Sequence, residues 1–366
     1  MIKSSWLSYL PGKSAVAVVA CLMLQTHAVQ ASAFNTPGNI LIADQFNNRI
    51  IEIDQQHHVV WQFGDTVSTA GPHSVVAPND VERVGNFTLI AGTGAPAGSE
   101  PSCPTGCQDN RVILVDRKGR IVWQYGQTGI AGSGPDQLNT PVFAAFLPSR
   151  HVLITDQANA RVIEVNRHHR IVWQYGTTGV SGADADQLNN PNSAVLLENG
   201  HVLIADENNN RVIEVNRAKR IVWQYGSPSD TATLNGAAFA SRLVNGHTLI
   251  TDSNNNRIVE IDASRNVVST YVTNTRAGSV ANPLPTRAVR LRSGNTLISD
   301  QFNGQVIEID PAQNIVFSQG QIAVNGIATG QLNAPYDAKV IGDYTGLTPP
   351  FFDLFDFLDD DEECDH

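Results

Sequence analysis

The sequence predicts an all-β fold, a six-bladed β-propeller of four-stranded antiparallel blades. Two observations carry this prediction: a repeated pattern of short apolar runs, and one unmatched apolar run near the C-terminus. The clearest copy of the pattern extends from His201 to Gly226, and the other five begin at Leu41, Leu89, Leu153, Leu249 and Leu297. A fixed period over this many units is typical of propellers, solenoids and repeat arrays.

Each copy contains three apolar runs of four to six residues, rich in Val and Ile and separated by Asn-rich or basic turns. Runs of this length between turn residues predict strands and hairpins, not helices. A fourth apolar run precedes the triplet, as at 192–197 after Gln-Leu-Asn-Asn-Pro. Four antiparallel strands at a spacing of about 50 residues are one propeller blade.

The two ends of the repeat predict how the ring closes. The first triplet has no preceding apolar run, whereas the run at 331–340 follows the sixth triplet and has no triplet of its own. We expect this C-terminal strand to join the three N-terminal strands in blade one. Closure of this kind removes exposed sheet edges, which otherwise favour aggregation.

The repeated unit resembles a known family. Gln-Leu-Asn-x-Pro, a strand, Asn-Gly-His, Leu-Ile-Ala-Asp and Asn-Asn-Arg-Val together resemble the NHL repeat, over about residues 37–343. The strand ending Ile-Val-Trp-Gln-Tyr-Gly is also similar to blades of bacterial arylsulfotransferase-like propellers. These resemblances imply the fold. They imply no single activity, because such propellers include binding scaffolds, lyases, lactonases and sulfotransferases.

The N-terminus predicts export. A cleaved signal peptide at 1–33 is predicted by Lys3, an apolar run at 15–24 and the sequence Ala31-Ser32-Ala33. The apolar run is too short to span a membrane. The propeller is then expected at 34–343, as a monomer in the periplasm or outside the cell. The net charge of −11 argues against nucleic acid and anionic membranes as partners.

The C-terminal tail at 344–366 combines Phe and Leu with a run of acids. It is interpreted as a disordered terminus, with a docking segment as the alternative. Cys364 lies in this tail without an assigned partner. In contrast, Cys103 and Cys107 lie in an insertion at 93–110 in blade two and are predicted to form a disulfide. The stapled insertion is expected to be a lid or a docking element.

Several residues recur in most blades, and we interpret them as parts of the blade. The repeated Asp before each Asn-rich turn is expected to cap that turn. Arg and Glu three residues apart in the third strand are expected to form ion pairs between blades. The repeated Trp of the fourth strand is expected to wedge between blades. The tryptophans are Trp61, Trp123, Trp173 and Trp223.

The innermost strand breaks the repeat, so its side chains are the candidates for function. Alignment on the residue two past the Pro gives, for blades one to six, Asp337, Asp80, Phe143, Ser193, Phe239 and Arg287. Tyr336 precedes Asp337, and two residues further along their strands come Lys339 and Glu82. A mouth that is half polar and half aromatic is typical of a small-ligand site. The alternative is that two ion pairs, Arg287–Asp337 and Lys339–Glu82, plug the channel.

The favoured function is a scaffold that binds a protein or a small ligand over the central channel. The alternative is a metal-dependent enzyme such as a lactonase, a lyase or an arylsulfotransferase-like enzyme. In that case Asp80, Glu82 and Asp337 would hold a hard cation such as calcium, and Arg287 would stabilise developing negative charge.

Overall fold

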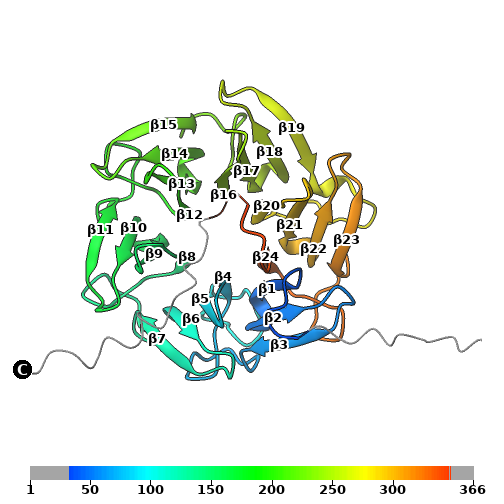
Figure 1. The fold of residues 1–366 in the computed structure, drawn as a ribbon. Coiled ribbons are helices and arrows are strands. Elements are labelled where there is room, and N and C mark those ends of the chain that lie inside the picture. Colours follow the sequence, from blue (N-terminus) through cyan, green and yellow to red (C-terminus); the bar gives the residue numbers. More distant parts are fainter. Residues whose placement is uncertain (1–32, 346, 348–366) are drawn as a thin grey trace, which may run out of the picture. The chain divides into compact units, whose positions relative to one another are not determined.

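The computed structural model describes residues 33–345 and 347. In this part of the chain, 24 strands form six four-stranded antiparallel sheets, arranged as blades around a central axis (Figure 1). The innermost strands are β24, β4, β8, β12, β16 and β20. The predicted fold class is therefore confirmed.

The blades follow the chain order, with one exception at the closure. Blade one consists of β24 (Pro335–Val340), β1 (Ile40–Asp44), β2 (Arg49–Ile53) and β3 (Val59–Phe63). Blade two consists of β4 (Pro78–Val84), β5 (Phe87–Ala95), β6 (Cys107–Val115) and β7 (Ile121–Tyr125). Blade three consists of β8 (Pro141–Phe146), β9 (Val152–Asp156), β10 (Arg161–Val165) and β11 (Ile171–Tyr175).

The remaining three blades repeat this arrangement. Blade four consists of β12 (Pro191–Leu196), β13 (Val202–Asp206), β14 (Arg211–Val215) and β15 (Ile221–Gly226). Blade five consists of β16 (Ala237–Arg242), β17 (Thr248–Asp252), β18 (Arg257–Ile261) and β19 (Val267–Val272). Blade six consists of β20 (Arg287–Arg290), β21 (Thr296–Asp300), β22 (Gln305–Ile309) and β23 (Ile315–Gly320).

Short 3₁₀ helices occupy six of the connections. They are η1 (Gln45–Asn47), η2 (Gln157–Asn159), η3 (Glu207–Asn209), η4 (Ser253–Asn255), η5 (Thr273–Thr275) and η6 (Gln301–Asn303). Among the helices of the described residues, none is long and apolar enough to cross a membrane.

Ring closure takes place in blade one as predicted. β24 pairs antiparallel with β1, with Ile42 opposite Ala338 and Ile40 opposite Val340. The first and last strands of the propeller thereby share one sheet. The predicted signal peptide up to residue 32, the tail from residue 348 and Cys364 lie outside the described residues.

The recurrent Asp organises the turn between the second and third strands. In blade three, the Oδ2 atom of Asp156 accepts hydrogen bonds from Asn159 Nδ2 and Arg161 Nε, both at 2.7 Å. Its Oδ1 atom accepts a bond of 2.8 Å from the backbone N–H of Asn139. Because each oxygen is bonded within the blade, this Asp serves the blade architecture.

Blade two keeps this ion pair with different residues. Gly92 stands in place of the usual Asp, and Asp109 supplies the carboxylate that Arg111 Nε contacts at 2.5 Å. A Cβ atom on Gly92 would lie 2.7 Å from the Asp109 carboxylate. The glycine is therefore required by the close approach of the substituted acid.

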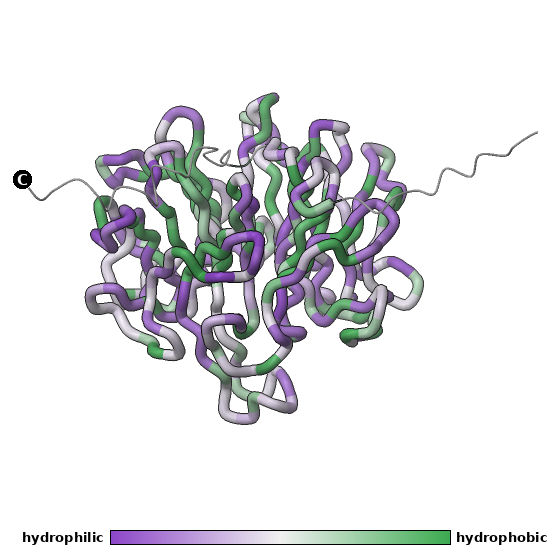
Figure 2. The backbone as a smooth tube through the Cα atoms, turned by 60° about the horizontal axis from the view of Figure 1, so that its bottom comes forward, coloured by the Kyte–Doolittle hydropathy of each residue, from purple (hydrophilic) through white to green (hydrophobic). Residues whose placement is uncertain are grey.

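Neighbouring blades are joined by ion pairs and by indole rings. Glu52, Glu164, Glu214 and Glu260 each pair with an Arg of the following blade. In the hydropathy colouring, hydrophobic stretches lie along the strands while hydrophilic stretches gather in the turns (Figure 2). The apolar core is accordingly divided among the interfaces between blades.

Candidate functional site

The inner strands bring the aligned residues of all six blades to the same level of the channel. Asp80 pairs with Ala91, Phe143 with Thr155, and Arg287 with Ser299 across their sheets. Each of these partners directly precedes the position of the recurrent Asp, which is Gly92 in blade two, Asp156 in blade three and Asp300 in blade six. All six aligned residues are buried: Asp337, Asp80, Phe143, Ser193, Phe239 and Arg287.

Arg287 extends from blade six across the channel. Its Nη1 atom donates to Asn192 Oδ1 of blade four at 3.0 Å, and its Nη2 atom donates to the carbonyl oxygen of Val142 of blade three at 3.2 Å. Its side chain is only 1% exposed. Its Nη1 atom also donates to the carbonyl oxygen of Ala238 of blade five at 3.5 Å, so the guanidinium ties four blades together across the channel.

Aromatic rings surround this guanidinium. The Arg287 Cζ atom lies 5.2 Å from the ring centroid of Tyr336, 5.3 Å from Phe239 and 5.8 Å from Phe143. Cation–π contacts at this range stabilise a desolvated guanidinium. The Tyr336 hydroxyl accepts a 2.8 Å hydrogen bond from Asn192 Nδ2. Burial and the nearby charge of Glu207 raise the pKa of Tyr336 to about 12.

Lys339 forms the second charged centre of the channel. Its Nζ atom donates to Asp337 Oδ2 at 2.6 Å, to the carbonyl oxygen of Val81 at 2.7 Å and to Asp80 Oδ1 at 3.0 Å. Arg287 Nε lies 3.9 Å from the same oxygen of Asp80. Burial would lower the pKa of Lys339, but the carboxylates of Asp337 and Asp80 raise it above its usual value.

The ion pairs differ from those expected if charges plugged the channel. The expected pairs were Arg287 with Asp337 and Lys339 with Glu82. Lys339 instead pairs with Asp337 and Asp80, because Asp337 lies two residues away on the same face of β24. Glu82 accepts a 2.8 Å bond from the backbone N–H of Phe146 in blade three. Burial raises the pKa of Glu82 to about 8, and Lys339 only partly opposes this shift.

The arrangement of the Asp80, Glu82 and Asp337 carboxylates does not suit a calcium ion. The Lys339 ammonium lies between Asp80 and Asp337, where a calcium ion would have to bind both. Glu82 is directed at the backbone of β8. Within residues 33–345 and 347, no three His, Cys, Asp or Glu side chains are arranged to hold a metal ion.

Beside Glu82 and Lys339, the channel retains a cavity of about 10 Å³. Phe143, Ala144, Ala145, Val195 and Leu347 complete its lining. A cavity of about 10–15 Å³ holds one water molecule. This cavity is therefore too small for a small organic ligand.

The insertion of blade two is docked against blade one. Cys103 and Cys107 are disulfide-bonded, as predicted. Cys103 is fully buried in an apolar cluster with Val76 and Ala77. Glu100 Oε2 accepts hydrogen bonds from Ser68 Oγ at 3.1 Å and from Asn48 Nδ2 at 3.2 Å. The two strands extend into the predicted loop, so that only residues 96–106 connect them.

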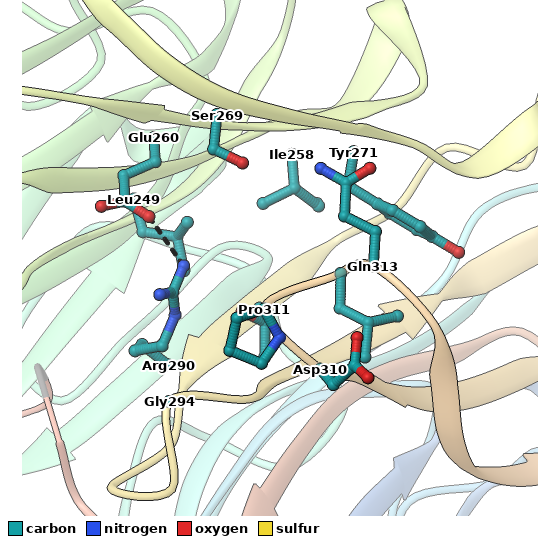
Figure 3. A pocket seen from close by; sticks show the side chains of 12 residues that line it. Leu249, Ile258, Glu260, Ser269, Tyr271, Arg290, Gly294, Asp310, Pro311 and Gln313 are labelled. Carbon is teal, nitrogen blue, oxygen red and sulfur yellow. Dashed lines mark hydrogen bonds and ion pairs between the residues drawn. The ribbon is translucent and has the colours of Figure 1, made fainter.

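A larger pocket of about 180 Å³ lies between blades five and six (Figure 3). None of the residues predicted for the functional site lines it. Ser269 lines the pocket at the position that Trp occupies in blades one to four. The gap in the repeated Trp was a signal in the sequence, but only the structure shows the space that it leaves.

The comparisons with known proteins agree with the fold. The NHL repeat model matches residues 188–213, which belong to blade four. None of the curated proteins matches the chain. The matches do not show the resemblance to arylsulfotransferase-like blades.

Among solved structures, a protein of unknown function from Bacteroides caccae is 16% identical, with 83% of this chain and 98% of that chain covered and a TM-score of 0.56. A streptogramin B lyase is 15% identical, with 79% and 80% covered and a TM-score of 0.50. A nidogen/laminin complex is 12% identical, with 76% and 92% covered and a TM-score of 0.50. At these identities the likeness shows the fold alone. The described chain is therefore a six-bladed β-propeller that contains an NHL repeat.

Proposed function

We propose that this protein is an exported binding scaffold that holds a partner protein on the face carrying the connections between blades. The observation that carries the proposal is the closure of the channel. The charged residues singled out on the inner strands are buried. Lys339 bonds to Asp80 and Asp337, while Glu82 and Arg287 bond to other groups of the inner strands, and the cavity beside them holds one water molecule. A ligand would therefore lie on the propeller and not in its channel.

The face with the connections between blades offers apolar contact surface. Equivalent tight turns after the fourth strands of blades two, three and six end at Ile130, Val180 and Val324. These side chains are 51%, 42% and 42% exposed. Exposed aliphatic residues in equivalent turns supply the apolar centre that a protein interface needs, with polar loops as its rim.

Export is supported by the disulfide between Cys103 and Cys107. Disulfides persist in oxidising compartments and are rare where glutathione keeps thiols reduced. The N-terminal sequence pattern points to the same compartment.

A metal-dependent enzyme is the competing function, and calcium distinguishes the two. On the scaffold proposal, millimolar calcium leaves the melting temperature of the protein unchanged, because Lys339 occupies the space between the carboxylates. A calcium-dependent rise in the melting temperature that disappears in Asp80→Asn would contradict the proposal and favour the enzyme.

The partner is sought by photo-crosslinking in cells that naturally make the protein. A photoreactive amino acid is placed at Ile130, Val180 or Val324, one position at a time. Matched controls carry it at Val172 and Val222, which are 47% and 48% exposed but lie on outer strands. We expect one shared protein adduct at the turn positions and none at the controls. Adducts at neither set, or equal adducts at both, would refute the proposed binding face.

A further inference from the structure

The pocket between blades five and six corresponds to the place of a missing indole ring. In blades one to three, the fourth-strand Trp donates its Nε1–H to a backbone carbonyl of the next blade. The bonds are Trp61 to Arg117 at 3.0 Å, Trp123 to Arg167 at 3.3 Å, and Trp173 to Arg217 at 3.1 Å. At these junctions the indole ring therefore packs against an apolar cluster, and its N–H has a fixed hydrogen-bond acceptor.

A Glu–Arg pair covers the Trp ring from equivalent positions at the junction of blades one and two and at the junction of blades four and five. Arg83 pairs with Glu52 at 2.7 Å, and its Cζ atom lies 4.9 Å from the ring centroid of Trp61. Arg242 pairs with Glu214 at 2.9 Å and lies 4.7 Å from Trp223. The guanidinium is thereby held over the face of the indole, where a cation–π contact is favourable.

Blade five keeps this frame but has no ring in it. Ser269 lies opposite Glu260, as Trp223 lies opposite Glu214. Arg290 donates to Glu260 at 2.7 Å, and both side chains border the empty pocket (Figure 3). The Nε atom of Arg290 is buried without a hydrogen-bond partner. The guanidinium that covers Trp61 and Trp223 at the other two junctions thus faces open space here.

The rest of the pocket matches an indole in polarity and size. Leu249, Ile258, Ile309 and Tyr271 give it apolar and aromatic walls. Pro311 follows Asp310 directly, as Arg117 follows Asp116, so its carbonyl has the position of the indole acceptors. A dry cavity of about 150 Å³ binds benzene in a protein core. A pocket of about 180 Å³ therefore suits a bicyclic aromatic ring.

We propose that this pocket is a binding site for an indole ring that comes from outside the chain. The ring would stack against Arg290, lie in the place that Ser269 leaves open and donate its N–H to the carbonyl of Pro311. The Glu260–Arg290 pair adds no net charge and the carboxylate of Asp310 in the lining opposes an anion, so the site favours a neutral ring with one donor. The site lies apart from the turns of the proposed binding face and does not depend on that proposal.

The test uses indole itself, titrated into the full chain by calorimetry. We expect saturable 1:1 binding. Naphthalene-like rings without an N–H should bind about fivefold more weakly, the equivalent of one lost hydrogen bond. Ser269→Trp fills the pocket with the chain's own ring and should weaken indole binding at least tenfold while raising the melting temperature. Ser269→Ala keeps the pocket and should bind indole as the parent does.

Trp173→Ser is the matched reciprocal variant. It empties the equivalent junction of blades three and four, so it should lower the melting temperature and gain a second indole site that restores part of that loss. Absence of indole binding to the parent, or equal binding by the parent and Ser269→Trp, would overturn the proposal.

Two further ligands identify the source of the ring. N-acetyltryptophanamide and a Gly-Gly-Trp-Gly-Gly peptide carry the indole of a partner protein, with Gly-Gly-Leu-Gly-Gly as the control. Binding of indole and of both Trp ligands assigns the site to a Trp side chain. Binding of indole alone assigns it to a small indole compound.

Discussion

At the scale of single residues, Lys339 determines how the buried charges of the channel are paired. Its ammonium group bonds to the carboxylates of Asp80 and Asp337 and to the carbonyl oxygen of Val81. The charged side chains that suggested a ligand site therefore neutralise one another. Buried ion pairs of this kind contribute little net stability when intact, but they are costly when one partner is removed.

Replacement of Lys339 by Met should therefore be severe. Asp80 and Asp337 would be left buried without their cation, and we expect a loss of about 3–5 kcal/mol in the free energy of unfolding. Denaturant unfolding measures this loss. A double variant that adds only Asp337→Asn should recover most of it, because Asp80 keeps the charge of Arg287 Nε at 3.9 Å. A Lys339→Met protein as stable as its parent would contradict this role.

The raised pKa of Glu82 predicts that the free energy of unfolding depends on pH. Its pKa is raised from 4.5 to about 8 in the folded chain, so the folded state holds a proton that the unfolded chain releases between these values. The stabilisation is complete below pH 4.5 and is lost as the pH rises through about 8. The free energy of unfolding should fall by up to about 1.4 kcal/mol per pH unit in this window.

Glu82→Gln isolates this effect, since the amide oxygen can still accept the bond from Phe146. The difference in the free energy of unfolding between parent and variant should shrink or reverse as the pH rises from 5 to 8. A difference that is constant over this range would show that Glu82 is ionised throughout.

At the scale of elements, the repeat specified the fold and the registers. Alignment on the inner-strand Pro placed Asp80, Arg287 and Asp337 at one level because the strand period of two fixes which side chains share a face. The partners of the charges were not predictable in this way. They depend on how far each side chain reaches across the channel, and Arg287 reaches blades three and four.

The pocket beside Ser269 is a second feature that the sequence alone could not predict. The sequence shows that blade five departs from the repeated Trp, but a departure can be filled by a neighbour. At the junction of blades six and one, Phe317 stacks on His57 with ring centroids 4.9 Å apart. Only the packing of each junction distinguishes a filled position from an empty one.

Deletion of the closing strand tests the element on which the ring depends. Without residues from Gln331 onward, β1 would lose its partner β24 and expose an unpaired edge and the apolar face of blade one. The truncated chain should be insoluble or strongly destabilised, as solubility and thermal melting would show. A melting temperature equal to that of the full chain would contradict closure by β24.

At the scale of the whole molecule, the inner strands are tied together at the axis, and the binding that we propose takes place on the surface. Through their hydrogen bonds, Arg287 and Lys339 together involve the inner strands of all six blades, and one cavity of single-water size lies beside them. The surface turns and the junction of blades five and six are the two places where we propose that a partner or ligand binds. The repeat specifies the blades. Where it is interrupted at the axis, Arg287 and Lys339 connect the inner strands, whereas the interruption at Ser269 leaves a pocket.

The accessibility of Lys339 tests the closed channel most directly. The native protein is treated with an amine-acetylating reagent, and the modification of each lysine is followed by mass spectrometry. Lys118 and Lys219, the other lysines among the described residues, are exposed and serve as internal references. We expect both references to react while Lys339 stays unmodified until the protein is unfolded. Reaction of Lys339 at the rate of Lys219 in the native protein would show that the channel is open, and would contradict the account.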